Sequence, residues 1–249
     1  MGSSDGSLCT IGIDYARLRR ADPRIAARID DALGDAVSVL NVGAGAGSYE
    51  PTERRITSLE PSIEMIRQHP ESTRVIQGQA EALPFADASF DAVMAVLTVH
   101  HWSDKAQGLR ELRRVSRGPV VILTFDASHG LFWLADYLPE LVTLDEAIMP
   151  PMEFYAQAMG PVSIVPVPIP HDCQDGFLAS YWRRPSAYLD PCVRAAISSF
   201  HALGDVSAEL EQLEADIASG DWAERHAALL DLAELDCGYR LVVSADSRQ

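Results

Sequence analysis

Hydrophobic residues in the first half of the chain form short apolar runs, separated by stretches in which they recur every three or four positions. The runs are predicted to be strands: "AVSVLNV", "RRITSLE", "TRVIQG", "SFDAVMAVLTV" and "PVVILTF". Two intervening stretches, "PSIEMIRQH" and "SDKAQGLRELRRVSR", show helical spacing, the second with Leu109, Leu112 and Val115 on one face. This alternation predicts βαβ units and a parallel, doubly wound sheet.

The pattern is less regular beyond residue 126. "VSIVPVPIP" alternates like an edge strand interrupted by prolines, and "GYRLVVS" predicts a closing strand. Leu210, Leu213 and Ile217 recur at helical spacing in an acidic segment, which predicts an amphipathic helix. We therefore expect an α/β protein with a doubly wound, mostly parallel seven-stranded sheet and an elaborated C-terminal half.

A further helix is predicted ahead of the first strand. Asp22 followed by Pro23 is typical of a helix start, and Ile25, Ile29 and Leu33 then form one apolar stripe. The five arginines of the stretch 17–28 are interpreted as a solvated face of this region. A local basic groove is the alternative.

Composition excludes some classes of function. The net charge of −16 argues against a nucleic-acid partner, since such binding relies on Lys and Arg at phosphates. No apolar run is long enough to span a bilayer, and the polar start lacks a signal-peptide pattern, so a cytoplasmic protein is expected. The four cysteines, spaced without a metal-ligand or CxxC pattern, are expected to be reduced and mostly buried: Cys9, Cys173, Cys192 and Cys237.

Three glycines follow the first predicted strand at alternate positions, Gly43, Gly45 and Gly47. The turn from this strand into the next helix is where open α/β sheets bind ligands, and glycines there let a ligand approach the main chain. A dinucleotide fingerprint requires a glycine or alanine where this chain has Ser48, and a merely tight turn is a further alternative. Glu60 ends the second strand and is placed for ribose hydroxyls with either class of nucleotide cofactor.

Four blocks occur in the order and spacing typical of one family: "VLNVGAGAGSYE", "LEPSIEM", "GQAEALPFADASFDAVMAVLTVHHW" and "ELRRVSRGPVVIL". Over roughly residues 35 to 126 the chain resembles the class I S-adenosylmethionine-dependent methyltransferases, particularly the small-molecule subgroup that includes UbiE-like enzymes (methyltransferase type 11). The resemblance implies that S-adenosyl-L-methionine is the cofactor and that a small molecule accepts the methyl group at O, N or C.

The resemblance also implies roles for single residues. Gly43, Ala44 and Gly45 would pass beneath the methionine part and ribose, and Glu60 would accept both ribose hydroxyls. The other residues expected at the cofactor are Asn41, Gln79, Ala80, Glu81, Leu97 and Thr98. Gln79 departs from a common aspartate beside the adenine, and Asn41 replaces a frequent aspartate, which is expected to change the bracing of the loop.

Two consecutive histidines, His100 and His101, are the candidates for a general base because they leave the fourth strand beside the expected cofactor. On an extended chain their side chains would point to opposite sides, so only one would face the methyl group, and His101 is favoured. We expect Trp102 to pack against the core and fix the ring. A histidine that merely shapes the loop is the alternative.

The substrate is expected to contact the N-terminal segment and the aromatic residues of the second half. The residues predicted for this role are Tyr15, Arg19, Trp133, Tyr137, Tyr181 and Trp182. A surface helix for the first two, and ordinary core packing for the aromatic residues, are the alternatives. Neither "HDC" nor "HHWSD" supplies a ligand set, so no metal is expected.

No repeat or linker divides the chain, so one domain is expected over residues 1–249. Its predicted parts are a disordered start (1–8), N-terminal lid helices (9–34), a cofactor-binding core (35–126), a variable substrate-pocket region (127–238) and a closing strand (239–245). A relative that binds the cofactor without methylating and a nicotinamide-dependent oxidoreductase remain as alternatives. The sequence leaves the oligomeric state open and allows a homodimer.

Overall fold

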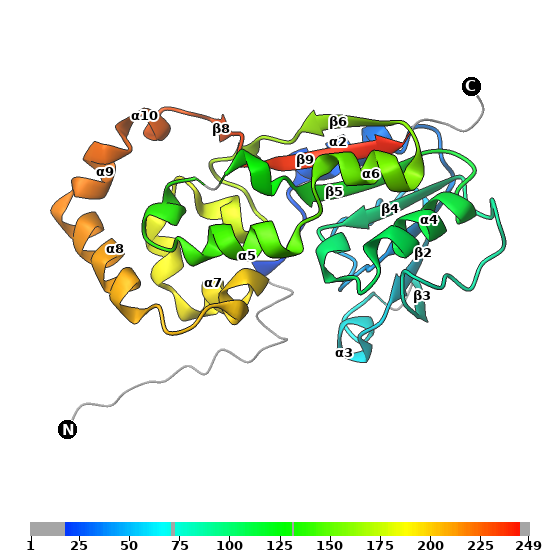
Figure 1. Cartoon of the computed structure of the whole chain (residues 1–249), viewed down its shortest axis with the longest axis horizontal. Helices are drawn as coiled ribbons and strands as arrows, with labels where there is room; N and C mark the ends of the chain where they lie inside the picture. The colour runs from blue at the N-terminus through cyan, green and yellow to red at the C-terminus, as the bar shows by residue number, and fades with distance from the viewer. Residues whose placement is uncertain (1–17, 71–72, 131, 245–249) are drawn as a thin grey trace.

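A seven-stranded sheet forms the centre of the computed structural model, which describes residues 18–70, 73–130 and 132–244 (Figure 1). The strand order is β3-β2-β1-β4-β5-β9-β6. Strands β1, β2, β3, β4 and β5 run parallel to one another, whereas β9 is antiparallel to both β5 and β6. The strands are β1 (Ser38–Val42), β2 (Arg55–Glu60), β3 (Arg74–Gln77), β4 (Ala92–Val96), β5 (Val120–Phe125), β6 (Val162–Pro166) and β9 (Tyr239–Ser244). The predicted mostly parallel, seven-stranded sheet is confirmed.

Helices cover both faces of this sheet (Figure 1). The α-helices are α2 (Pro23–Ala32), α3 (Ile63–Ile66), α4 (Lys105–Val115), α5 (Glu140–Ile148), α6 (Met152–Met159), α7 (Pro191–Ala195), α8 (Ser207–Ser219), α9 (Asp221–Arg225) and α10 (Ala227–Leu230). The 3₁₀ turns are η1 (Val99–His101), η2 (Ala127–His129), η3 (Trp133–Asp136), η4 (Leu178–Tyr181), η5 (Pro185–Leu189) and η6 (Ser198–Ala202). A short ladder joins β7 (Ile169–Pro170) to β8 (Glu234–Leu235).

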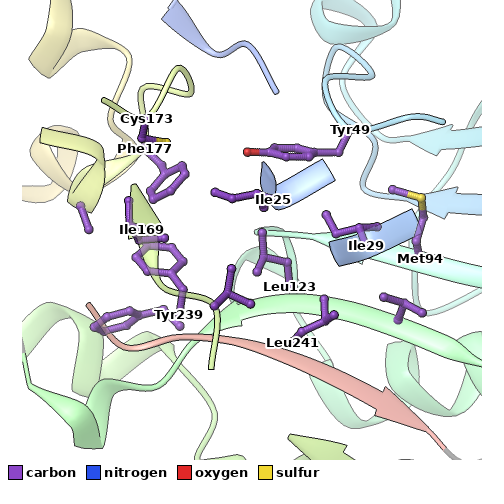
Figure 2. Packing of buried hydrophobic residues seen from close by; sticks show 14 of the residues in the cluster. Ile25, Ile29, Tyr49, Met94, Leu123, Ile169, Cys173, Phe177, Tyr239 and Leu241 are labelled. Atoms are coloured by element: carbon purple, nitrogen blue, oxygen red, sulfur yellow. The ribbon is translucent and has the colours of Figure 1, made fainter. Parts of the chain in front are cut away.

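The two helices read most clearly from the sequence form as expected. Asp22 caps α2 by accepting a hydrogen bond from the backbone of Arg24, and the stripe of α2 packs on β4 and β5 (Figure 2). On the opposite face, Leu109 and Leu112 of α4 are fully buried against the sheet together with Tyr155 of α6. Alternate residues of the buried strands therefore supply two separate cores.

The connection from β1 to β2 differs from the expectation, because the glycine loop leads into turns and not into a helix. Gly43, Gly45 and Gly47 all have positive φ angles, and Pro51 follows shortly after. Successive left-handed residues and a proline are incompatible with helical backbone. The crossover is consequently made by loop alone, and α3 is also shorter than the apolar spacing predicted.

The second half of the chain adds an aromatic core beyond the sheet. Trp133, Tyr188 and Trp222 are buried together there, and Leu213 on the predicted amphipathic helix α8 packs against them. Figure 1 shows α8, α9 and α10 following one another along the edge of the molecule farthest from β3. Among the described cysteines, Cys173 and Cys237 are buried and Cys192 is half-buried, all as free thiols, whereas Cys9 lies outside the described residues.

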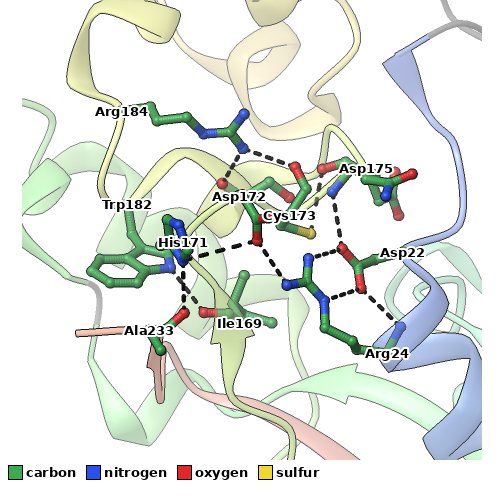
Figure 3. A network of polar contacts seen from close by, with 12 residues as sticks. Asp22, Arg24, Ile169, His171, Asp172, Cys173, Asp175, Trp182, Arg184 and Ala233 are labelled. Carbon is green, nitrogen blue, oxygen red and sulfur yellow. Dashed lines mark hydrogen bonds and ion pairs between the residues drawn. The ribbon is translucent and has the colours of Figure 1, made fainter.

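A polar network ties α2 to the segment after β7 (Figure 3). The guanidinium of Arg24 donates to Asp22 at 2.7 Å and to Asp172 at 2.7 Å, and the backbone of Gln174 donates to Asp22. Burial opposes ionisation of Asp22, but these hydrogen bonds hold its pKa below the ordinary value. The N-terminal helix is thereby fixed beside the segment that leads from β7 to η4.

Candidate functional site

A cavity of about 770 Å³ opens at the carboxyl ends of β1, β2, β4 and β5. This is the edge at which open α/β sheets bind ligands, and the volume lies in the range of small-molecule sites. Strand ends and the glycine loop form one side of the cavity. Side chains from α5, η4 and the α7–η6 segment form the other side.

The glycine loop lies against the floor of this cavity. The backbone N–H groups of Gly43 and Ala44 donate to the carbonyl of Leu59 at 2.8 and 3.2 Å, which fixes the loop over β2. A Cβ on Gly43 would lie 2.1 Å from Oγ1 of Thr98, so a side chain is excluded there. At Gly45 no described atom lies within 4 Å of the Cβ position. The backbone of Gly45 therefore faces open cavity.

Glu60 stands beside this open space. Its Oε2 atom accepts a hydrogen bond from the backbone of Gly45 at 2.8 Å, and its Oε1 atom accepts one from Ser62 at 3.0 Å. The residue is 7% exposed. A carboxylate offers about four acceptor positions, so these two bonds orient the group and leave it able to accept from the hydroxyls of a ligand.

All the residues predicted to bind the cofactor line this one cavity: Asn41, Gly43, Ala44, Gly45, Glu60, Gln79, Ala80, Glu81, Leu97 and Thr98. Asn41 donates from Nδ2 to Glu50 at 3.0 Å and so braces the glycine loop. Glu81 accepts from the backbone and hydroxyl of Ser103, which connects its segment to the start of α4. Leu97 has a φ of 51°, a strained conformation for a branched side chain and one that is concentrated at functional sites.

The two histidines lie on the 3₁₀ turn η1 and both line the cavity. Their ring centroids are 3.9 Å apart, so the expectation that the side chains point to opposite sides is wrong. That expectation assumed extended backbone, whereas the chain turns at Thr98 and His101 donates to its carbonyl at 2.9 Å. The predicted core packing of Trp102 is confirmed, with its ring against Gly108.

The environment of the histidines lowers their basicity. Burial, with the nearby His101, Lys105 and Arg19, lowers the pKa of His100 to about 3. Desolvation by the cavity wall, with Lys105 and Arg19, also lowers the pKa of His101. Both rings are therefore neutral at pH 7, and His101 is the more exposed of the two. A ring with a pKa near 3 is a weak proton acceptor, so this geometry favours His101 over His100 as a base.

Arg19, which was predicted to contact the substrate, lines the cavity and is anchored by other residues at the same time. Its Nε atom donates to the buried Asp175 at 2.7 Å, while Tyr49 donates to the other oxygen of that carboxylate at 3.0 Å. The carbonyl of Arg19 accepts a hydrogen bond from Ser48 of the glycine loop. This network joins the segment ahead of α2 to the site. Tyr15, also predicted to contact substrate, lies outside the described residues.

The four aromatic residues predicted to border the substrate pocket lie elsewhere, because none is among the described side chains that line the cavity: Trp133, Tyr137, Tyr181 and Trp182. Three of them use their polar atoms in hydrogen bonds within the protein. Trp133 donates to the carbonyl of Trp182, whose own Nε1 atom donates to Ile169 at 2.9 Å (Figure 3). Tyr137 donates to Asp216, and the ring of Tyr181 packs edge-on to a neighbouring tyrosine. The prediction is corrected: they are core residues.

Other aromatic side chains, which the sequence analysis did not single out, form this wall. Phe125, Phe177, Tyr49 and Tyr239 line the cavity. The centroid of Tyr239 lies 4.7 Å from that of Phe177 and 5.5 Å from that of Phe125. Figure 2 shows Phe177 and Tyr239 grouped together, with the hydroxyl of Tyr49 directed toward them. Phe125 ends β5 and Tyr239 begins β9, so their positions at strand ends were the available signal.

Asp145 is a further cavity residue that was not predicted from the sequence. It lines the cavity from α5 and is 3% exposed. Its Oδ2 atom is buried without a hydrogen-bond partner, and burial alone raises the pKa of the carboxyl to about 7. The available signal was its place four residues after the buried Leu141, on the apolar face of the helix.

No group of three or more His, Cys, Asp or Glu side chains in residues 18–70, 73–130 and 132–244 is arranged to hold a metal ion. In the same part of the chain, no helix is long and apolar enough to cross a membrane.

Comparisons with known proteins agree on one family. A family model described as "Methyltransferase domain" matches residues 40–122. The crystal structure of a protein described as a methyltransferase of an antibiotic biosynthesis pathway, from Anabaena variabilis, superposes with a TM-score of 0.83. It is 33% identical, and the alignment covers 92% of this chain and 100% of that one.

Two curated relatives are similar over shorter segments. An uncharacterized methyltransferase of Bacillus subtilis, YcgJ, is 33% identical over 44% of this chain and 45% of its own length. A malonyl-[acyl-carrier protein] O-methyltransferase of Erwinia pyrifoliae is 38% identical over 34% of this chain and 35% of its own length. The chain thus matches less than half the length of these two relatives.

Proposed function

Because the chain belongs to the S-adenosylmethionine-dependent methyltransferase family, we propose that it transfers the methyl group of S-adenosylmethionine to a small-molecule acceptor. The matched relatives and the family model support this reaction class. The fold supports it as well, because the cavity lies at the strand ends of a Rossmann-like sheet.

The observation that carries the proposal is the pairing of Gly45 with Glu60. Gly45 offers bare backbone to open space, and the carboxylate of Glu60 is oriented beside it by two backbone N–H groups. A ribose with two hydroxyls fits such an acceptor pair. We assign the methionine part to the loop from Gly43 to Gly45 and the adenine edge to the segment from Gln79 to Glu81.

The protein's contribution to the chemistry would be alignment and exclusion of water. The cofactor supplies an already activated methyl group on a sulfonium, so the residues around it need to place the acceptor in line with that group. Positioning of this kind contributes roughly 7–11 kcal/mol to lowering a barrier. Leu97 and Thr98 would flank the reactive end, and the neutral ring of His101 would accept a proton from an acceptor that arrives protonated.

The acceptor side of the cavity supports a small, partly apolar substrate. Its aromatic wall is Phe125, Phe177 and Tyr239, with Met149 nearby on the same lining. Four expectations remain predictions. They are a cytoplasmic location, a homodimer, the lack of a nucleic-acid partner, and the division of the chain into a lid, a core and a substrate region.

Calorimetry with purified protein tests this function. S-adenosylmethionine and S-adenosylhomocysteine should both bind at one site per chain, and NAD and NADP should give no heat of binding. Binding of a nicotinamide cofactor together with failure of S-adenosylhomocysteine to bind would replace the proposal by an oxidoreductase.

A further inference from the structure

Helix α5 places one carboxyl group inside the cavity. Asp145 follows the buried Leu141 by one helical turn, so both lie on the face that is turned away from solvent. The residue is only 3% exposed, yet it borders the cavity. Its Oδ2 atom has no hydrogen-bond partner in the described part of the protein.

A buried carboxyl without a partner is an unfavourable arrangement. Transfer of an unpaired polar or ionised group from water into a protein interior has a large free-energy cost, which a hydrogen bond or an opposite charge offsets. Burial alone raises the pKa of Asp145 to about 7, so no cation among the described residues lies close enough to stabilise its ionised form appreciably. Arg19, on the same cavity lining, is bonded to Asp175. A ligand in the cavity is therefore placed to supply the missing partner.

The surroundings of Asp145 favour one kind of partner. Asp145 and Tyr239 line the same cavity, and the pKa of Tyr239 is raised chiefly by burial and additionally by the charge of Asp145. The ring of Tyr239 in turn packs with Phe125 and Phe177 on the cavity lining. Aromatic faces attract cations, and an ammonium donates hydrogen bonds to a carboxylate. A carboxylate beside such rings matches a protonated amine attached to an apolar or aromatic body.

Other ligand classes fit this half of the cavity less well. An anion would be repelled by the carboxyl, and the guanidinium of Arg19 on this half is already bonded to Asp175. A neutral hydroxyl would donate one hydrogen bond but would leave the ionised carboxyl without an opposite charge. The remaining titratable side chains on this half are Arg19, Tyr49, His100, His101 and His201, and the two adjacent histidines are neutral at pH 7.

We propose that Asp145, with the aromatic wall of Phe125, Phe177 and Tyr239, binds the methyl acceptor through a protonated amine. The protein then acts on small apolar or aromatic amines, and Asp145 determines this specificity. The inference rests on the proposed methyltransferase function and adds the class of acceptor to it.

The test is calorimetry of three matched probes with the protein saturated with S-adenosylhomocysteine: 2-phenylethylamine, 2-phenylethanol and 3-phenylpropionate. The amine should bind about 10- to 100-fold more tightly than the alcohol, the range for a hydrogen bond to a charged group. The carboxylate probe should bind most weakly. Asp145→Asn should remove the preference for the amine, and Glu146→Gln, which changes an exposed acid on the same helix, should keep it.

The outcomes separate this inference from the function on which it rests. If the wild-type protein binds S-adenosylhomocysteine but binds the amine no better than the alcohol, or binds none of the three probes, the acceptor class is wrong and the methyltransferase function stands. A preference that survives in Asp145→Asn contradicts the role of this residue. Failure to bind S-adenosylhomocysteine at all overturns the proposed function instead. If Asp145→Asn does not fold, the comparison of amine and alcohol binding by the wild-type protein still tests the acceptor class.

Discussion

The Oε2 atom of Glu60 accepts a hydrogen bond from the backbone nitrogen of Gly45 at 2.8 Å. This bond connects the end of β2 to the glycine loop that follows β1, and both residues line the cavity. Ser62 holds the second carboxylate oxygen, so the group has a defined orientation before any ligand arrives. Preorganisation of this kind reduces the ordering cost of binding.

Replacement of Glu60 by Gln should therefore weaken the binding of S-adenosylhomocysteine. The amide keeps one acceptor oxygen but loses the charge, and hydrogen bonds to charged groups contribute about 1.5–3 kcal/mol. We expect a loss of that size in calorimetry with an unchanged circular dichroism spectrum. Glu53→Gln, at an exposed position in the same connection, is the control and should bind normally. Equal affinities of the two variants would remove Glu60 from the cofactor site.

Gly45 and Gly34 provide a matched pair for testing the glycine loop. Their φ angles are 56° and 57°, and neither has a described atom within 4 Å of its Cβ position. Gly45 borders the cavity, whereas Gly34 lies in the turn after α2 and is not among the residues that line it. A valine at either position introduces similar left-handed strain, about 1–2 kcal/mol.

Gly45→Val should consequently abolish the binding of S-adenosylhomocysteine, while Gly34→Val should lower stability by a comparable amount and bind normally. Urea unfolding and calorimetry of both variants supply the comparison. Normal binding by Gly45→Val would mean that the loop serves only as a turn.

The cofactor half of this cavity was predictable because short, contiguous sequence motifs supply its residues. Residues such as Gly43 and Glu60 follow buried strands directly, and parallel strands bring their carboxyl ends together at one edge. The strands themselves were predictable from their β-branched apolar runs. Such local motifs are predictive because the position of a residue at the end of a strand follows from the strand itself and not from long-range side-chain packing.

The acceptor half was not predictable in the same way. Trp133 and Trp182 were predicted to border the pocket because aromatic residues accumulate in the second half of the chain. Long-range packing places both in the core. Phe125 and Tyr239 reach the cavity because β9 inserts antiparallel beside β5, a pairing between distant segments. Asp145 lies one helical turn after Leu141 but is followed by the exposed Glu146, so spacing alone did not distinguish a buried acid from a solvated one.

His101→Ala should lower kcat by about 10²-fold or more if the ring accepts a proton from the acceptor. Affinity for S-adenosylhomocysteine should remain within about twofold. Because the pKa of His101 is lowered, the acid limb of the rate profile should lie below the ordinary histidine value of about 6.5. The assay is S-adenosylhomocysteine formation across pH with an acceptor that the wild-type enzyme methylates.

His100→Ala is the comparison for this prediction. The pKa of His100 is about 3, so this ring is neutral and weakly basic throughout the assay range. We expect a smaller effect on kcat and no change in the acid limb. Near-wild-type rates of both variants at every pH would show that alignment operates without a histidine base.

Asp145 should make the free energy of unfolding depend on pH with a sign opposite to that of ordinary paired acids. Burial raises its folded pKa to about 7 from 3.8, so the folded state binds more protons than the unfolded state between these values. Stability from this group is therefore complete below about pH 4, falls as pH rises to about 7, and is constant above. A shift of about three units corresponds to roughly 4 kcal/mol.

Asp145→Asn has no proton to lose, so it should become increasingly stable relative to wild type over this window. Urea unfolding of both proteins at pH 4.5, 6 and 8 measures the difference, with Glu146→Gln as the exposed control that should show no such trend. A wild-type-to-variant difference that stays constant from pH 4.5 to 8 would mean that the carboxyl is paired or solvated in the folded protein, and that it does not offer an unmet charge to a ligand.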